Sequence, residues 1–484
     1  MYISLSPRYA VRNENGCSYL INVEQVLDKD PHPFGTMCIP PFMGYIIAHI
    51  GDYEYNKSIN IIADKLGISK EAISNFVRQL ENNEETKLFA LDEESSVRLP
   101  KRLLLKSDGY SHTKIFENED FTPTGNFTIK RPSMPLSINL MITTQCTTDC
   151  IYCYADKSLS PILDTNAVLH LIDELHEGGM VNITLTGGDI FARKDWSVIL
   201  SRLRELEYFP YISTKTPISE NEISILKELG YNEIQFSLDS KDIEVLNRMI
   251  NPPQNYLNSV KQFLNNAQKV GINVLIRSVL TSLNSDMQSI ESLYDFLSQH
   301  QAVKGWDITP AFFSKYKDLY YKNIEVSKDA LQEIYKFSKR DNLKFPIGLN
   351  KISENGYSIK KCDTVEDYVC HNQVCMANTS GMSILANGKC TVCEMLYEDE
   401  PFLIGNATKD TIKDIWNSQK ALDLYSLKQE TINNDSPCRK CPVFERCRNG
   451  YGKKVCYLDI RKTGKDLSYP DPRCPEADDY DIIF

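Results

Sequence analysis

The sequence predicts an α/β fold, a partial (β/α)6 barrel that follows a winged-helix-like module and precedes a cysteine-rich domain. Three observations support this prediction. Two helical patterns separated by a glycine lie before residue 90, strand-like and helix-like segments then alternate six times, and ten of the fifteen cysteines come after residue 361. The expected segments are the module over 1–90, a linker or loosely packed wrap over 91–133, the barrel over 134–345 and the cysteine-rich domain over 346–484.

The first segment is expected to form strands followed by a helix-turn-helix. Two alternating stretches, Tyr2–Val11 and Ser18–Val23, are separated by the turn signal Asn-Glu-Asn-Gly. Apolar residues at helical spacing follow in Ser58–Leu66, and Ser69 can cap a second helix over Lys70–Glu81. Strands followed by this pair of helices are typical of a winged helix.

The third segment is expected to contain parallel strands joined by helices. Its predicted strands are Leu136–Ile142, Val181–Leu185, Phe209–Ser213, Glu233–Leu238, Asn273–Leu280 and Gly305–Thr309. Right-handed crossovers would curl these strands into a barrel, and six units are too few to complete the eight-fold one. Functional side chains are then expected in the loops that follow the carboxyl ends of the strands.

Composition excludes several classes of function. The net charge is −11, so no global basic field attracts nucleic acid or an anionic membrane. No apolar run reaches 18 residues, and the first residues do not resemble a signal peptide. We therefore expect a cytoplasmic protein that contacts neither membrane nor nucleic acid. In a reducing compartment, clustered cysteines are more often metal ligands than disulfides.

Three cysteines follow the first predicted barrel strand in the spacing C-x3-C-x2-C. They are Cys146, Cys150 and Cys153, and Tyr152 precedes the last of them. Three thiolates on one short loop can hold three irons of a 4Fe–4S cube, which leaves the fourth iron open to an exogenous ligand. A structural zinc site would need four ligands, and three thiols that only pack in the loop would be unusual because free cysteines are rare and reactive.

This loop resembles the cluster-binding motif of the radical S-adenosylmethionine (SAM) superfamily. In that family the open iron binds the amino and carboxylate groups of SAM. An electron from the cluster then yields methionine and a 5′-deoxyadenosyl radical that removes a hydrogen from the substrate. The resemblance implies that the barrel is a radical SAM core with a SAM-binding 4Fe–4S cluster on Cys146, Cys150 and Cys153. It also implies an external electron donor such as flavodoxin or ferredoxin.

Further segments resemble the SAM contacts of that family. Thr186-Gly-Gly-Asp189 follows the second strand, where the family has Gly-Gly-Glu, and Ser213-Thr-Lys215 follows the third strand, with Lys215 where asparagine is common. The resemblance implies a set of SAM-binding residues, namely Tyr152, Gly187, Gly188, Asp189, Ser213, Lys215, Ser237 and Arg277. The alternatives are a plain turn at Gly-Gly-Asp, a barrel-lining role for Ser237 and an outward-pointing Arg277.

The late cysteines resemble the SPASM extension of radical SAM peptide maturases. The family pattern is C-x9–15-G-x4-C, then C-x2-C-x5-C-x3-C and a last cysteine. In this sequence the x3 step lands on Tyr451, and the next cysteine is Cys456. The resemblance implies two auxiliary 4Fe–4S clusters, three clusters in all. The outer would be held by Cys438, Cys441, Cys447 and Cys474, and the inner by Cys370, Cys375 and Cys393, with Cys456 as its fourth ligand. Cys362 and Cys390 are the alternative candidates for the inner cluster. Spacing alone also suits one or two zinc ribbons.

The N-terminal module raises the question of what it binds. Residues 51–90 carry five lysines and arginines against seven aspartates and glutamates, which does not suit a DNA reader. The arrangement resembles the PqqD-like peptide-recognition elements of ribosomal-peptide maturases, which bind a leader peptide as an added strand at a sheet edge. The resemblance therefore implies a ribosomal precursor peptide as the partner, recognised through its leader segment.

Together these features imply an enzyme that abstracts hydrogen from a ribosomally made peptide and installs a cross-link. A thioether is the first expectation and a carbon–carbon link the second. One alternative is a sulfatase maturase that forms formylglycine, which would not need residues 1–90. The other is a DNA-binding regulator with a redox or zinc cluster, which the acidic charge opposes. The sequence identifies no general base.

Overall fold

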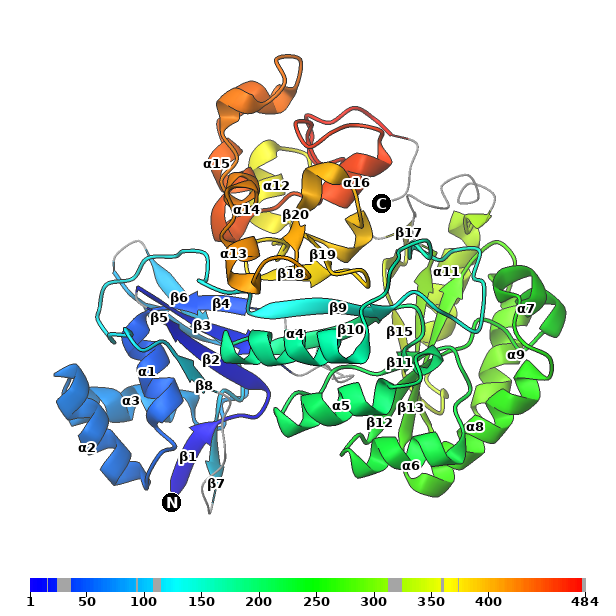
Figure 1. The fold of residues 1–484 in the computed structure, drawn as a ribbon, viewed down its shortest axis with the longest axis horizontal. Coiled ribbons are helices and arrows are strands. Elements are labelled where there is room, and N and C mark those ends of the chain that lie inside the picture. The colour runs from blue at the N-terminus through cyan, green and yellow to red at the C-terminus, as the bar shows by residue number, and fades with distance from the viewer. Residues whose placement is uncertain are drawn as a thin grey trace. The chain divides into compact units, whose positions relative to one another are not determined.

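The computed structural model describes residues 1–14, 16–23, 36–92, 95–107, 115–311, 324–357, 361–372 and 374–480. The chain forms two compact units. The first comprises Met1–Ser137 with Leu175–Asn182, and the second comprises Ile138–Glu174 with Ile183–Phe484. Figure 1 labels the helices and strands of each unit and colours them along the chain.

The first unit is built on a four-stranded sheet in the order β4–β3–β2–β8. Its strands are β2 (Tyr9–Glu14), β3 (Cys17–Asn22), β4 (Thr36–Ile39) and β8 (Ile115–Glu117). β2 and β3 form an antiparallel hairpin at the predicted turn, where Gly16 has φ +85° and Asn15 lies outside the described residues. The stretch predicted as Tyr2–Val11 is two strands, because β1 (Tyr2–Leu5) instead pairs with β7 (Leu104–Ser107).

Three helices lie between β4 and β8 in the described chain of this unit. They are α1 (Pro41–His49), α2 (Tyr55–Leu66) and α3 (Lys70–Leu80). α2 ends at Gly67 in the left-handed conformation, and the Ser69 hydroxyl accepts a hydrogen bond from the Ala72 amide at 3.2 Å. The predicted helix-turn-helix and its cap are therefore confirmed. A hairpin of β5 (Lys87–Ala90) and β6 (Ser96–Leu99) follows, in the position of a wing.

The described part of residues 91–133 is not a simple linker. It contains β6, β7 and β8, and its leucines Leu99, Leu103 and Leu104 are fully buried in the core of the first unit. The prediction missed these strands because they are only three or four residues long and alternate with charged residues, which leaves no sustained period. Residues 93–94 and 108–114 lie outside the described residues.

The second unit contains the predicted series of strands and helices. A parallel sheet has the order β11–β12–β13–β14–β15. The strands are β11 (Ser213–Thr214), β12 (Glu233–Ser237), β13 (Asn273–Leu280), β14 (Val303–Pro310) and β15 (Ile347–Leu349). The helices are α5 (Trp196–Glu205), α6 (Glu220–Glu228), α7 (Ile243–Ile250), α8 (Tyr256–Val270), α9 (Met287–Leu297) and α11 (Lys328–Ser338). β15 shows that this sheet extends beyond the boundary predicted at residue 345.

The first two predicted barrel strands lie in a different sheet. β9 (Ser137–Thr143) and β10 (Asn182–Gly187) belong to a sheet of order β10–β9–β18–β19–β20, and α4 (Thr165–Glu177) connects them. The other strands are β18 (Gly381–Ile384), β19 (Lys389–Thr391) and β20 (Leu403–Asn406). The predicted partial barrel is therefore open, since the described strands form two sheets and one of them continues into the cysteine-rich segment.

The rest of the cysteine-rich segment consists of short helices and loops. These helices are α12 (Val365–His371), α13 (Ile412–Trp416), α14 (Gln419–Tyr425), α15 (Phe444–Arg448) and α16 (Tyr457–Lys462). A two-stranded sheet of β16 (Ile352–Ser353) and β17 (Gly356–Tyr357) precedes them. None of the described helices has both the length and the apolar character that crossing a bilayer requires.

Candidate functional site

The predicted cluster loop begins just after β9. Cys146 is exposed, whereas Cys150 and Cys153 are partly buried. The pKa of Cys146 is raised to about 11, mainly by partial burial, with Lys157 lowering it and Asp189 raising it. The thiols of Cys150 and Cys153 also raise this pKa, so the three thiols are close enough to interact. Among the described residues, no three Cys, His, Asp or Glu side chains already surround a possible metal position. The donor set still fits a 4Fe–4S cluster, since three thiols share one loop and turn by rotation about χ1.

Two glycines at the end of β10 pack directly against this loop. A Cβ atom on Gly187, where φ is +118°, would lie 2.2 Å from the Thr143 carbonyl oxygen, and one on Gly188 would lie 2.0 Å from that of Gln145. The Gly188 amide also donates to the Thr143 carbonyl at 2.7 Å. The glycines are thus required by close contact between two backbones, and this contact holds the entry to the cysteine loop in place.

Asp189 orders the segment that follows β11. Its carboxylate is buried and accepts hydrogen bonds from the Thr214 hydroxyl, the Lys215 amide at 2.9 Å, and the amide and hydroxyl of Thr216. It also accepts one from the Phe191 amide at 3.1 Å. The predicted contact of Asp189 with SAM stays a prediction, and the role that the geometry assigns to Asp189 is to position residues 214–216.

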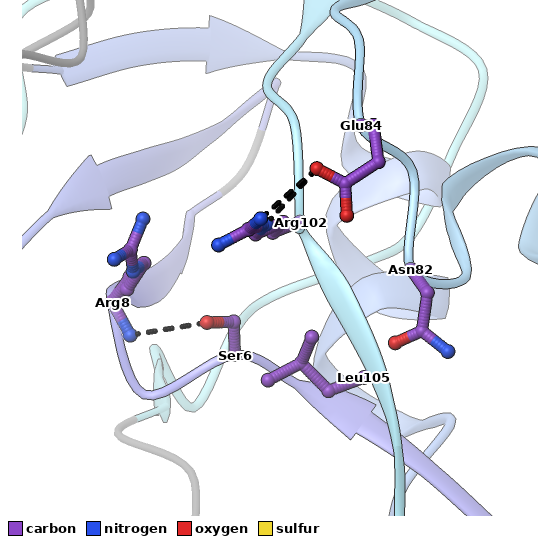
Figure 2. Close-up of a pocket in the computed structure, with 6 residues that line it drawn as sticks. All are labelled: Ser6, Arg8, Asn82, Glu84, Arg102 and Leu105. Carbon is purple, nitrogen blue, oxygen red and sulfur yellow. Dashed lines mark hydrogen bonds and ion pairs between the residues drawn. The ribbon is translucent and has the colours of Figure 1, made fainter. Parts of the chain in front are cut away.

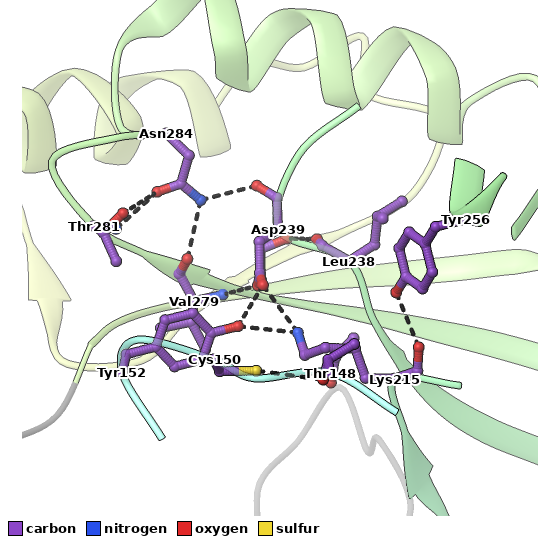
Figure 3. A network of polar contacts seen from close by, with 12 residues as sticks. Thr148, Cys150, Tyr152, Lys215, Leu238, Asp239, Tyr256, Val279, Thr281 and Asn284 are labelled. Atoms are coloured by element: carbon purple, nitrogen blue, oxygen red, sulfur yellow. Dashed lines mark hydrogen bonds and ion pairs between the residues drawn. The ribbon is translucent and has the colours of Figure 1, made fainter. Parts of the chain in front are cut away.

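A buried polar network connects the cysteine loop to the ends of β11 and β12 (Figure 3). The Lys215 ammonium lies 2.9 Å from the Asp239 carboxylate and 3.0 Å from the Tyr152 hydroxyl, which itself donates to Asp239. Although burial lowers the pKa of Lys215, the carboxylate of Asp239 and the thiol of Cys150 raise it above its ordinary value. Lys215 is therefore charged, and with Asp239 it fixes the ring of Tyr152 between two of the predicted ligands.

The Asp239 end of the network is anchored by backbone groups. The other carboxylate oxygen of Asp239 accepts from the Val279 amide at 2.9 Å, and the Asn284 amide donates to the carbonyls of Asp239 and Val279. The Tyr256 hydroxyl donates to the Lys215 carbonyl at 2.9 Å (Figure 3). Each charged group in this network thus has several fixed partners, which is what a preorganised binding site requires.

Polar side chains also occupy one face of the parallel sheet. The Ser213 hydroxyl donates to Gln235 at 2.7 Å, and the Gln235 amide donates to the Ser237 hydroxyl at 2.8 Å. In the register of the sheet, Ser237 is opposite Arg277. The guanidinium of Arg277 lies 3.3 Å from the carboxylate of Asp307 on β14. The structure thus brings the predicted residues Ser213, Ser237 and Arg277 to one polar face.

Four of the late cysteines converge as predicted for the outer set. Cys438, Cys441, Cys447 and Cys474 all line one pocket, together with apolar side chains such as Tyr368 and Phe444. Burial raises the pKa of Cys447 to about 12 and that of Cys474 to about 11, so these thiols are protonated unless a cation stabilises the thiolates. Four thiols in one apolar pocket form a donor set that fits a 4Fe–4S cluster or a zinc ion.

The predicted inner set is only partly assembled. Burial raises the pKa of Cys393 to about 12, and the thiol of Cys375 raises it further; Cys375 also raises the pKa of Cys456. Cys375 is therefore close enough to interact with each of the other two thiols. Cys370 is exposed, and its thiol contacts Glu366 at 3.4 Å and the guanidinium of Arg446 at 3.9 Å. The predicted roles of Cys370 as an inner ligand and of Cys456 as the fourth ligand both stay predictions.

Sequence patterns missed several residues of this region. Asp239, Tyr256 and Asn284 hold the network in Figure 3, and only Asp239 had a visible signal, as an acidic residue directly after a strand. Glu394, next to Cys393, is partly buried, which raises the pKa of its carboxyl group, and its side chain interacts with Thr186. No local pattern marks Tyr256, Asn284 or Glu394, because their partners are distant in the sequence.

A separate pocket of about 370 Å³ lies in the first unit (Figure 2). It is lined by Ser6, Arg8, Asn82, Glu84, Arg102 and Leu105. The Arg102 guanidinium pairs with Glu84 at 3.0 Å, but both side chains are at least half exposed, so the pair contributes little stability. None of the residues predicted from the sequence lines this pocket.

Two family models match the second unit. Residues 140–297 match the radical SAM superfamily, and residues 375–442 match SPASM, an iron–sulfur cluster-binding domain. These ranges contain the three-cysteine loop and the Gly-Gly-Asp segment, and four of the late cysteines that were predicted as ligands.

Curated relatives share limited identity with the chain. A probable GTP 3′,8-cyclase of Methanosarcina mazei is 23% identical over 171 residues, which are 34% of this chain and 51% of that protein. An Fe-coproporphyrin III synthase of Methanosarcina barkeri is 28% identical over 164 residues, 33% of this chain and 40% of that protein. The chain thus spans about half the length of these relatives. A PqqA peptide cyclase of Granulibacter bethesdensis is 22% identical over 352 residues, 70% of this chain and 87% of that protein.

Solved structures share the fold over nearly the whole chain. Streptococcus suis SuiB bound to the precursor peptide SuiA is 14% identical and covers 98% of this chain and 100% of that one, with a TM-score of 0.63. SuiB bound to S-adenosylmethionine gives a TM-score of 0.60, again at 14% identity, with 98% and 100% of the two chains covered. At this identity the likeness establishes the fold.

Proposed function

Because the chain carries a radical SAM domain followed by a SPASM iron–sulfur domain, we propose that it is a maturase that cross-links a ribosomally made peptide. The observation that carries the proposal is the three-cysteine loop, which Gly187 and Gly188 hold against β10 beside the network of Lys215 and Asp239. This combination offers three thiolates and an ordered polar wall in one place.

Cys146, Cys150 and Cys153 would hold the SAM-binding cluster. Bound there, a 4Fe–4S cluster and SAM would supply a 5′-deoxyadenosyl radical, which abstracts hydrogen from carbon. The chain's own residues position the parts of the site. Lys215 and Asp239 hold the side chain of Tyr152, a residue of the cysteine loop, while Asp189 orders residues 214–216.

The polar face of the parallel sheet would orient SAM and substrate. Ser213, Gln235 and Ser237 form a chain of hydrogen bonds across β11 and β12, and Arg277 pairs with Asp307 across β13 and β14. Ser213, Ser237 and Arg277 are the residues of this face that the resemblance assigns to SAM. Hydroxyl, amide and guanidinium groups can bind the hydroxyl, amino and carboxylate groups of such a ligand.

The late cysteines would hold two auxiliary clusters. Cys438, Cys441, Cys447 and Cys474 would hold the outer one, and Cys375, Cys393 and Cys456, with Cys370, the inner one. A cross-link removes two hydrogens from the peptide. One leaves with the radical, and the other leaves as a proton while its electron passes to an acceptor, a role that an auxiliary cluster suits. A flavodoxin or ferredoxin would supply the electron that starts the reaction.

A precursor peptide would bind through its leader to the first unit. β4 and β8 are the edge strands of the described sheet, so their outer backbone groups can pair with an added strand. The likeness to SuiB, which was solved with a precursor peptide, and to a PqqA peptide cyclase supports a peptide as substrate. A thioether is the first choice of bond and a carbon–carbon link the second.

The test is anaerobic turnover with SAM, dithionite and a precursor peptide encoded by a neighbouring gene. We expect 5′-deoxyadenosine and a peptide lighter by two hydrogens. Alkylation of product thiols identifies the bond, because a thioether protects one cysteine from the reagent and a carbon–carbon link protects none. Cys150→Ala should abolish SAM cleavage, whereas Cys38→Ala, a half-buried cysteine of β4, is the matched control and should retain it.

Failure of the intact, cluster-containing protein to cleave SAM would refute the proposal. Conversion of a cysteine or serine to formylglycine would instead favour sulfatase maturation, and tight binding to a random DNA duplex would favour the regulator.

A further inference from the structure

Arg448, the last residue of α15, is a buried cation beside the outer cysteine set. It is 1% exposed, and its guanidinium donates to the Cys438 sulfur at 3.2 Å, to the Leu467 carbonyl at 2.6 Å and to the Tyr469 carbonyl. Its Nε–H has no acceptor among the described residues. No carboxylate of the described residues forms an ion pair with Arg448. Among its hydrogen-bond partners in the described residues, only the Cys438 sulfur can carry a negative charge.

Lys453 is a second buried cation, five residues later. It is 0% exposed, and its ammonium donates to the Ala377 carbonyl at 2.8 Å and lies 5.0 Å from the ring centre of Tyr457. Its own carbonyl accepts a hydrogen bond from the amide of Cys375, a residue of the inner set, at 2.7 Å. Lys453 is therefore beside the inner set, and the described residues provide no carboxylate for it.

The carboxylates near these cations already have other partners. Asp471 lines the outer pocket but pairs with Arg473 at 2.5 Å, and Asp459 pairs with Lys462 at 2.9 Å and with Arg473 at 3.1 Å. Neither acid is left to balance Arg448 or Lys453. A buried charge without a counter-ion strongly destabilises a fold, so such a charge is expected only where an anion binds.

We infer that Arg448 and Lys453 are the counter-ions of two anionic metal–thiolate centres, and that each sets the reduction potential of its own centre. Arg448 serves the centre on Cys438, Cys441, Cys447 and Cys474. Lys453 serves the centre on Cys375, Cys393 and Cys456. The inference rests on the proposed function for the presence of these centres. It adds that the two cations stabilise the charge of the centres, which the cysteine spacing does not predict.

A buried cation beside a cluster should raise the reduction potential of that cluster. One-electron reduction adds a negative charge to a cluster without making or breaking a bond, and a nearby positive charge stabilises the reduced form. Loss of that charge makes the midpoint potential more negative. Because the two cations lie beside different cysteine sets, each substitution should shift mainly one of the two auxiliary potentials.

The experiment is a dithionite titration of the whole anaerobic protein, with each reduced cluster followed by electron paramagnetic resonance. Arg448→Gln should move the outer potential to a more negative value and leave the inner one nearly unchanged, and Lys453→Met should do the reverse. Arg448→Lys, which keeps the charge, should restore the outer potential. Lys420→Gln is the control, since Lys420 is an exposed lysine of α14 paired with Glu400.

Iron and sulfide analysis separates this inference from the proposed function. Unchanged potentials in Arg448→Gln or Lys453→Met proteins with a full set of clusters would overturn the inference and leave the maturase proposal standing. If one variant does not fold, the other decides by the same criterion.

If the parent protein holds zinc in place of the auxiliary clusters, the readout becomes the rate of zinc loss to a chelator. Faster loss from the variants than from Lys420→Gln supports the counter-ion role, and equal rates refute it.

Discussion

The buried pair of Lys215 and Asp239 provides a quantitative test of the site. Lys215→Met removes the ammonium and leaves the Asp239 carboxylate, whose side chain is 0% exposed, with the Tyr152 hydroxyl and the Val279 amide as donors. Breaking a buried ion pair from one side costs about 3–5 kcal/mol. Since two donors remain, we expect the lower end, about 3 kcal/mol of lost unfolding free energy.

The double variant Lys215→Met/Asp239→Asn separates charge from packing. It leaves no unpaired charge, and the asparagine oxygen can still accept from the Val279 amide. Its loss should therefore be about 1–2 kcal/mol, smaller than that of the single variant, although more atoms have changed.

The measurement is the thermal unfolding midpoint followed by tryptophan fluorescence, because Trp196 and Trp306 are both buried in the second unit. Because the unfolding entropy grows with chain length, a loss of about 3 kcal/mol corresponds to a decrease of roughly 4–5 °C for the second unit, which comprises Ile138–Glu174 and Ile183–Phe484. Equal midpoints for the single and double variants would refute the account, since an unpaired carboxylate would then carry no cost. Lys215→Arg, which keeps the charge, should lose less than Lys215→Met.

Three further predictions concern other parts of the chain. The His49 ring is hydrogen-bonded to Asp52 at 2.8 Å and to Glu117 at 3.2 Å, and although burial lowers the pKa of His49, these carboxylates raise it to about 9. Up to about 3 kcal/mol of unfolding free energy should therefore be lost as the pH rises from 6.5 through 9. An unfolding free energy that does not change over this pH range would contradict the prediction. Gly188→Ala should prevent cluster assembly, measured as iron content, whereas Gly125→Ala, where a Cβ meets nothing within 4 Å, should not. Cys441→Ala should keep some 5′-deoxyadenosine formation but lose cross-linked peptide, and full product yield would exclude the auxiliary role.

The sequence predicted the elements that have a clear local signal. The spacing of apolar residues predicted the helix-turn-helix and the β/α series, and the serine at position 69 predicted the helix cap. The short strands β6, β7 and β8 were not, because their burial depends on partners far along the chain. β9 and β18 are paired although they are far apart in the sequence, so the alternation of apolar and polar residues within either strand could not predict this pairing.

The candidate site follows the same division. The family resemblance assigned Cys438, Cys441, Cys447 and Cys474 to one set, and all four line one pocket. Short spacing keeps the first three together, whereas the position of Cys474 depends on the fold. Gly187 and Gly188 were predicted as SAM contacts, and that role stays a prediction. The structure shows a different reason for glycine at both positions, namely close contact with the backbone of residues 143–145. The Asp239 network and the buried cations Arg448 and Lys453 could not be predicted, because burial and charge pairing are properties of the folded chain.

The central claim is that Cys146, Cys150 and Cys153 hold a cluster with one open iron that binds SAM. The most direct measurement is electron paramagnetic resonance of the dithionite-reduced protein before and after SAM is added. We predict a 4Fe–4S signal whose shape changes with SAM and that is absent from Cys150→Ala. A signal that SAM leaves unchanged, or anaerobic protein that contains zinc and no iron, would contradict the claim.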